Sequence, residues 1–117
     1  MILNDPAGAA RALASELPPE EGEAVIRSFA KHSARSFGDP LTYAGYMDIP
    51  ASFLFCEEDT AGPPKFQQAW IDAVERVSGR KIEVTKIKAG HMMNFRNERD
   101  LIEFLVSRAR KAEGKGD

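Results

Sequence analysis

The pattern of hydrophobic and polar positions predicts a helical first part of the chain and a strand-helix-strand-helix second part. Ala51–Cys56 is a short apolar run entered through Pro50, which is typical of a strand buried on both faces. Lys81–Lys88 alternates apolar with polar positions, so one face of this second strand is expected to be in water, at the edge of a sheet. Because a helix is predicted between the two strands, we expect them to run parallel.

Two further segments show helical spacing of their apolar residues. The helix between the strands ends at Gly79, and the residues expected on its buried face are Phe66, Ala69, Trp70, Ala73, Val74 and Val77. The last helix begins after Asn97, and the residues expected to face the sheet are Leu101, Ile102, Leu105 and Ala109. Residues 113–117 are polar and rich in glycine, so a disordered tail is predicted there.

The first 47 residues predict a helical hairpin. Asp5 and Pro6 suit the N-cap and first position of a helix, and the pair Pro18-Pro19 ends it and begins a second. The second helix is expected to continue to about Gly38, with an apolar side made of Val25, Phe29 and Phe37, and of Ile26 as a further candidate. The hairpin contains many small residues, which favours the interpretation that it is a lid and not part of the core. We therefore divide the chain into cap-like helices and linker, 1–47, and an α/β segment, 48–112.

Composition excludes several classes of protein. The chain has 117 residues, enough for one domain, with 43% hydrophobic residues and a net charge of −2. No basic stripe suits a nucleic acid, no apolar run approaches the roughly 20 residues of a membrane span, and the first residues do not resemble a signal peptide. The single cysteine, Cys56, is expected to be a buried and inert thiol. We predict a cytoplasmic protein without cofactor or metal ion.

Candidate chemistry lies in the loops after the two strands. Glu57, Glu58 and Asp59 follow the first strand, and Gly90 and His91 follow the second. Since parallel strands end at the same edge of a sheet, an acid and a histidine can meet there. Asp59 is the best candidate because it comes last, where the strand turns into the loop. An acid that orients a histidine is two thirds of a nucleophilic triad. The alternative is a solvated run of charges beside a histidine without a role.

These residues resemble a known family. The stretches FLFCEED, PKFQQAWID and KIEVTKIKAGHMM look like the C-terminal part of α/β-hydrolase-fold enzymes, in the esterase and hydroxynitrile-lyase-like branch with its fungal-type relatives. The resemblance covers about residues 48–109, and residues 4–47 more loosely resemble part of the helical cap of that family. It implies a partial α/β-hydrolase fold, with Asp59 as triad acid and His91 as triad base.

The family's nucleophile is missing from the pattern. Its serine lies in G-x-S-x-G on a sharp turn from strand to helix, and this chain has no such motif. The nearest sequence is A-x-S-x-G, centred on Ser36, which is a weak candidate because the residues before it predict a helix rather than a buried strand. His32 is expected to be a surface residue of that helix. The chain resembles the family without its nucleophile-bearing N-terminal half.

Two functions follow as expectations. The first is a protein derived from a serine hydrolase, inactive alone, that would act on a small apolar ester-like substrate if an N-terminal half completed it. The second is a non-catalytic interaction module that docks a partner chain or a second copy through the open edge of the first strand. A natural short protein, a truncation and an excised fragment all fit the first expectation. Either way, we expect a homo-oligomer, a complex with a partner chain, or a poorly ordered monomer.

Overall fold

Two parallel strands lie side by side in the second part of the chain. The computed structural model describes residues 4–114. Strand β1 (Ser52–Cys56) pairs with β2 (Glu83–Ile87) in a register that places Ser52 beside Glu83 and Cys56 beside Ile87. The strands are connected by helix α3 (Pro64–Ser78). Gly79 follows as its C-cap with a φ of +68°, a backbone conformation in which any side chain would be strained. The predicted strand-helix-strand unit is therefore confirmed.

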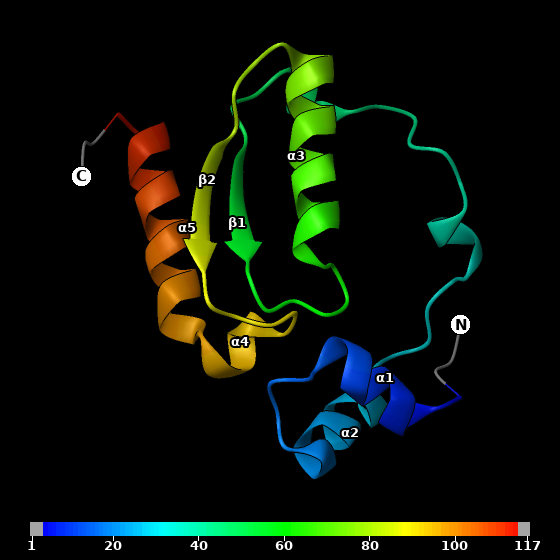
Figure 1. Ribbon diagram of the computed structural model, residues 1–117. Coiled ribbons are helices and arrows are strands. Elements are labelled where there is room, and N and C mark those ends of the chain that lie inside the picture. Colours follow the sequence, from blue (N-terminus) through cyan, green and yellow to red (C-terminus); the bar gives the residue numbers. More distant parts are fainter. Residues whose placement is uncertain (1–3, 115–117) are drawn as a thin grey trace.

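The remaining helices complete a mixed α/β fold. The short helix α4 (Met93–Arg96) and the helix α5 (Glu98–Ala112) follow β2. In Figure 1, α3 lies beside β1 and α5 lies beside β2. Arg108 and Lys111 of α5 form ion pairs with Glu83 of β2, and their hydrogen bonds lower the pKa of this carboxyl to about 2. The predicted tail, 113–117, lies mostly outside the described residues.

A helical hairpin precedes the sheet, as predicted. Helix α1 (Pro6–Leu13) begins with Asp5, whose Oδ1 accepts a hydrogen bond of 2.9 Å from the backbone N–H of Gly8. Helix α2 (Pro19–Arg27) packs closely against α1, and a Cβ at Gly22 would lie 3.4 Å from that of Ala10. Figure 1 shows that the hairpin lies beyond the carboxyl ends of the strands. This position places it next to the acid and histidine loops.

The second helix is shorter than predicted. It ends at Arg27, and only a single turn of 3-10 helix, η1 (Arg35–Phe37), follows before the linker with its own turn η2 (Gly45–Met47). The hydroxyl of Ser28 donates to the carbonyl of Val25 at 2.6 Å and competes with a further turn. The prediction failed because residues 28–43 are all exposed, Phe37 to 68%, and a helix without packing is marginal.

The buried apolar side chains form two small groups. The hairpin buries Ala10, Ala14, Leu17 and Ile26, and the sheet region buries Phe55, Cys56, Ile71 and Ala89. The strand β1 is buried only toward its carboxyl end, whereas burial along its whole length was predicted. The division of the chain at residue 47 stays a prediction.

The buried faces of the two long helices differ from the prediction. Trp70 on α3 is 52% exposed, and Ile102 and Leu105 on α5 are 57% and 56% exposed. Phe66, Ala69, Val77 and Ala109 are exposed as well. In α3 the buried residues are instead Gln67 and Ile71. The reason is that a sheet of two strands is too narrow to cover the apolar side of either helix.

The chain exposes more surface than a compact domain of its size. Its accessible area is 8464 Å², compared with about 6300 Å² for a folded monomer of this mass. Its radius of gyration is 16.3 Å, compared with about 13 Å for a compact domain of this length. Within residues 4–114, no helix has the length and apolar character needed to cross a membrane. The excess area includes the exposed helix faces and the extended segment between α2 and β1.

Candidate active site

Asp59 is held firmly in the loop after β1. Its Oδ1 accepts hydrogen bonds from the backbone N–H groups of Ala61 and Gly62, at 2.8 and 2.7 Å, so the carboxylate closes a turn within its own loop. The side chain is 10% exposed. Glu57 and Glu58, in contrast, are exposed, and only their backbone N–H groups bond to the neighbouring strand segment. Of the three acids, only Asp59 is fixed toward the histidine loop.

The second oxygen of Asp59 faces His91. The distance between Asp59 Oδ2 and His91 Nδ1 is 2.9 Å, although the two residues come from loops after different strands. An ionised carboxylate only accepts hydrogen bonds, so Nδ1 carries the proton and donates it to this bond. The topology of parallel strands predicted the encounter, and the structure places the two side chains in contact.

The other ring nitrogen of His91 is available. Within the part of the chain that the structure describes, Nε2 makes no hydrogen bond, and the side chain is 41% exposed. With Nδ1 protonated, Nε2 has the free lone pair that can accept a proton from a nucleophile. The pair of Asp59 and His91, called the acid–base pair below, therefore has the geometry of a triad acid and base.

The helical hairpin contacts both loops of the acid–base pair. Thr60, next to Asp59, donates through its hydroxyl to the carbonyl of Ala12 at 2.8 Å. Glu16, in the turn between α1 and α2, accepts at Oε1 a hydrogen bond of 2.8 Å from the backbone N–H of Met92, next to His91. Neither contact could be predicted from the sequence, because no local motif marks it.

The side chain of Gln67 forms hydrogen bonds with the backbone at both ends of the acid loop. Its side-chain amide is almost fully buried and bonds to both backbone groups of Cys56, with Oε1 accepting at 2.9 Å and Nε2 donating at 2.8 Å. Nε2 also donates to the carbonyl of Gly62 at 2.6 Å. A neighbouring strand would supply comparable bonds at the open edge of β1. The signal for it in the sequence is a glutamine on the helix stripe that carries Ile71.

Cys56, the last residue of β1, is a buried free thiol. Its sulfur is 3.9 Å from the sulfur of Met93. Burial, followed by the negative charges of Asp59 and Glu16, raises the pKa of Cys56 to about 11. A thiol with this pKa is protonated at neutral pH and is a poor nucleophile. The prediction of a buried cysteine is confirmed.

Ser36 does not lie in a nucleophile elbow. It belongs to the exposed turn η1, and between residue 4 and this turn no strand precedes it. Its hydroxyl donates to the carbonyl of Ser33 at 2.8 Å and lies 3.4 Å from Nδ1 of His32, so both contacts are local. His32 is exposed, as predicted, although it does not lie in a helix. The geometry of the turn gives Ser36 no oxyanion donors of the elbow type.

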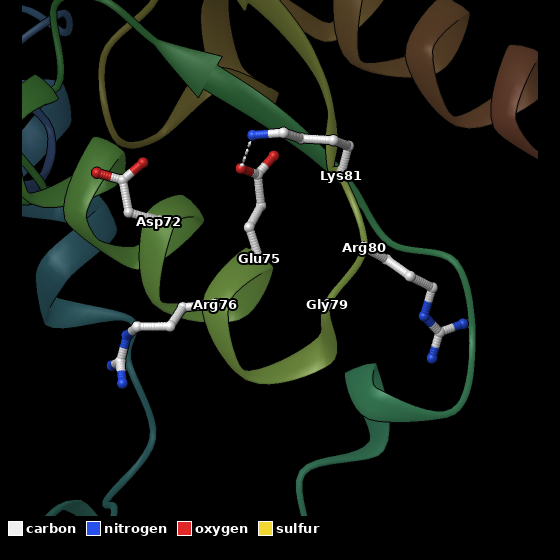
Figure 2. A pocket seen from close by; sticks show the side chains of 6 residues that line it. All are labelled: Asp72, Glu75, Arg76, Gly79, Arg80 and Lys81. Carbon is white, nitrogen blue, oxygen red and sulfur yellow. Dashed lines mark hydrogen bonds and ion pairs between the residues drawn. The ribbon is translucent and has the colours of Figure 1, made fainter.

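Two hollows in the surface lie away from the acid–base pair. One of about 340 Å³ lies at the end of α3, where Lys81 forms an ion pair with Glu75, lowering the pKa of that carboxyl (Figure 2). Arg80, which also lines this hollow, donates hydrogen bonds to the backbone carbonyls of Met47 and Asp48. These bonds attach the linker to the end of α3. A second hollow of about 1070 Å³ lies between the hairpin and the segment after it. Neither hollow includes Asp59 or His91.

Comparison with known proteins gives a match to part of another protein. No model of a protein family matches the chain. The chain is 44% identical over 68 residues to a protein of Phoma sp. named "Probable hydrolase R7". The match covers 58% of this chain and 28% of that protein, so the chain spans well under two thirds of its relative. The chain therefore has a relative that is named as a hydrolase.

Proposed function

We propose that this chain supplies the acid and the base of a serine-hydrolase triad in an α/β-hydrolase fold, and that the nucleophile comes from polypeptide outside it. The observation that carries the proposal is the 2.9 Å contact between Asp59 Oδ2 and His91 Nδ1. The identity to a named hydrolase supports it independently. Ser36 is not assigned a role, because its turn and its local hydrogen bonds do not suit a nucleophile.

The mechanism follows from the available nitrogen. A serine hydroxyl next to His91 Nε2 loses its proton to this nitrogen as it attacks an ester carbonyl, and His91 returns the proton to the leaving alcohol. Asp59 keeps Nδ1 protonated and stabilises the imidazolium that forms. Water, activated in turn by His91, then attacks the acyl-serine and releases the carboxylic acid product. The donors that stabilise the oxyanion must come with the nucleophile.

The surroundings of His91 favour a small apolar and uncharged acyl substrate. Met92 and Met93 are half-buried directly after it, and such side chains offer an adaptable apolar wall. Two carboxylates, those of Asp59 and Glu16, lie beside the histidine loop. They disfavour an anionic substrate through like-charge repulsion. No cofactor is needed for this chemistry.

Covalent labelling tests the proposal. A chimera is made in which this chain replaces the matching part of the Phoma relative, and the chimera is treated with a fluorophosphonate that labels activated serines. We expect labelling of the chimera but not of the 117-residue chain, because a fluorophosphonate reacts with a serine that a histidine activates. His91→Ala should slow labelling by about 10⁴-fold.

The matched control is His32→Ala, which removes the other histidine and should leave labelling unchanged. Labelling of Ser36 in the chain alone, abolished by His91→Ala, would show that the nucleophile lies within this chain and would contradict the proposal. A chimera that labels equally well without His91 would contradict the role of the base.

A second candidate function is an interaction module, and the exposed surface favours it. The side of β1 opposite β2 has no strand among the described residues, and Gln67 pairs only with Cys56 there. The exposed area exceeds that of a compact monomer by about 2000 Å², comparable to one side of a large permanent interface. A partner chain or a second copy docked on β1, α3 and α5 would cover this surface.

Light scattering after size-exclusion chromatography tests this assembly. We expect a dimer or a larger species, because an unpaired strand edge and exposed apolar helix faces recruit another chain. Leu54→Pro, which removes a backbone donor at the open edge of β1, should shift the species toward the monomer. A single monomeric species of 12.9 kDa that unfolds cooperatively would contradict the expectation.

A further inference from the structure

The carboxylate of Glu16 touches the residues on both sides of His91. Its Oε1 accepts the hydrogen bond from the N–H of Met92, and its Oε2 lies so close to Gly90 that a Cβ there would be 2.4 Å from it. Oε2 is buried and, among the described residues, has no hydrogen-bond partner. A glycine is therefore required for the carboxylate to lie against the histidine loop, and Gly90 is itself buried.

The same hairpin also holds the acid loop. Thr60 donates to the carbonyl of Ala12 at 2.8 Å and lies 3.2 Å from the hydroxyl of Ser15. Ala12, Ser15 and Glu16 are neighbours at the end of α1 and in the turn after it. One short segment therefore contacts the residue after Asp59 and the residue after His91. Segments far apart in sequence meet at this point, beyond the carboxyl ends of the strands (Figure 1).

We propose that this segment, residues 12–16, is a clamp that sets the geometry of the acid–base pair, and that Glu16 is a positioning residue for His91. The inference rests on the proposed function, in which Asp59 and His91 act together. Glu16 fixes the backbone after His91, and Thr60 fixes the backbone after Asp59. With both loops tied to one segment, the 2.9 Å contact keeps a single geometry.

A merely structural tether would have a different design. An apolar side chain could join the hairpin to the loop without burying a charged oxygen that lacks a partner, which is costly. The carboxylate instead offers an acceptor in the one direction that holds the N–H of Met92. Removal of the Glu16 carboxylate should therefore disturb the orientation of the His91 imidazole as well as the attachment of the hairpin to the histidine loop.

Nuclear magnetic resonance on the full chain in mildly alkaline solution tests the clamp. The variants are Glu16→Ala and Glu16→Gln, with Glu20→Ala as the control that removes an exposed carboxylate of the same hairpin. The readouts are the hydrogen exchange of the Met92 amide and the tautomer of His91 from its ring nitrogen shifts. We expect Glu16→Ala to accelerate this exchange about tenfold or more and to replace the single Nδ1–H tautomer by a mixture.

Glu16→Gln should keep the wild-type tautomer, because its amide oxygen still accepts the bond from Met92. Gly90→Ala is the second variant: its Cβ must displace the carboxylate, so it should act like Glu16→Ala, and it should add little in the Glu16→Ala background. It also serves as the test if Glu16→Ala does not fold. An unchanged His91 tautomer together with faster exchange at Met92 would overturn the proposal. These readouts need no nucleophile, so failed labelling of the chimera would leave them valid.

Discussion

Asn in place of Asp59 is expected to lower the turnover of the active chimera by about 10⁴-fold. The amide keeps the size of the side chain and can still bond to the backbone of Ala61 and Gly62. It can also donate toward Nδ1 of His91, which then carries the lone pair and leaves the proton on Nε2. A protonated Nε2 cannot accept the proton of a serine. Turnover of a small activated ester, compared for the two chimeras, measures the effect.

The neighbouring acids provide matched controls for Asp59. Glu57→Gln and Glu58→Gln remove one negative charge each from the same loop, and their side chains are exposed. We expect both chimeras to stay within about threefold of the parent, because surface charges in water contribute little. If either control lost as much activity as Asp59→Asn, the loss would reflect charge near the site. The assignment of the acid would then be wrong.

Leu in place of Gln67 is expected to destabilise the chain by about 3 kcal/mol or more, since three buried backbone groups lose their partner. These are the N–H and the carbonyl of Cys56 and the carbonyl of Gly62. Leu fills a similar volume, so the effect isolates the hydrogen bonds from packing. Urea unfolding of the two proteins gives the difference in free energy. A loss of this size is a large part of the stability of a small domain.

Gln68→Leu is the matched control for this substitution. Gln68 is the next residue of α3, is exposed, and bonds only to Asp72 one turn later. We expect a change within about 0.5 kcal/mol. A Gln67→Leu protein as stable as the control would mean that water takes over the backbone groups at this edge. The open edge of β1 would then be more accessible than the buried amide indicates.

The sequence was sufficient to predict the order of the elements and the meeting of Asp59 with His91. Both follow from short-range patterns: an apolar run, a helical stripe ending at Gly79, an alternating strand, and the rule that parallel strands end at one edge. The contact could be predicted without knowledge of side-chain packing, because two loops at the same edge of a two-stranded sheet must lie close together. The catalytic roles of the two residues stay a prediction.

The supporting contacts could not be predicted in the same way. Glu16 and Met92 are 76 positions apart, and Thr60 and Ala12 are 48 positions apart, with no periodic signal to connect them. The prediction of the buried face of α3 was wrong for another reason. Trp70 belongs to the apolar stripe, but the described sheet has no third strand to cover it. Periodicity shows which side of a helix is apolar, and only the neighbours decide whether it is buried.

The turn that holds Asp59 has a consequence for assembly. The backbone N–H groups of Ala61 and Gly62 fix the carboxylate whether or not another polypeptide is present. The conformational entropy lost in ordering the acid–base pair is therefore lost when this chain folds. Under the proposed function, a nucleophile-bearing polypeptide that docks here would use none of its binding free energy to order the pair. Its affinity would depend on the strand edge and the apolar helix faces, and its reactivity on one distance, from its serine to Nε2 of His91.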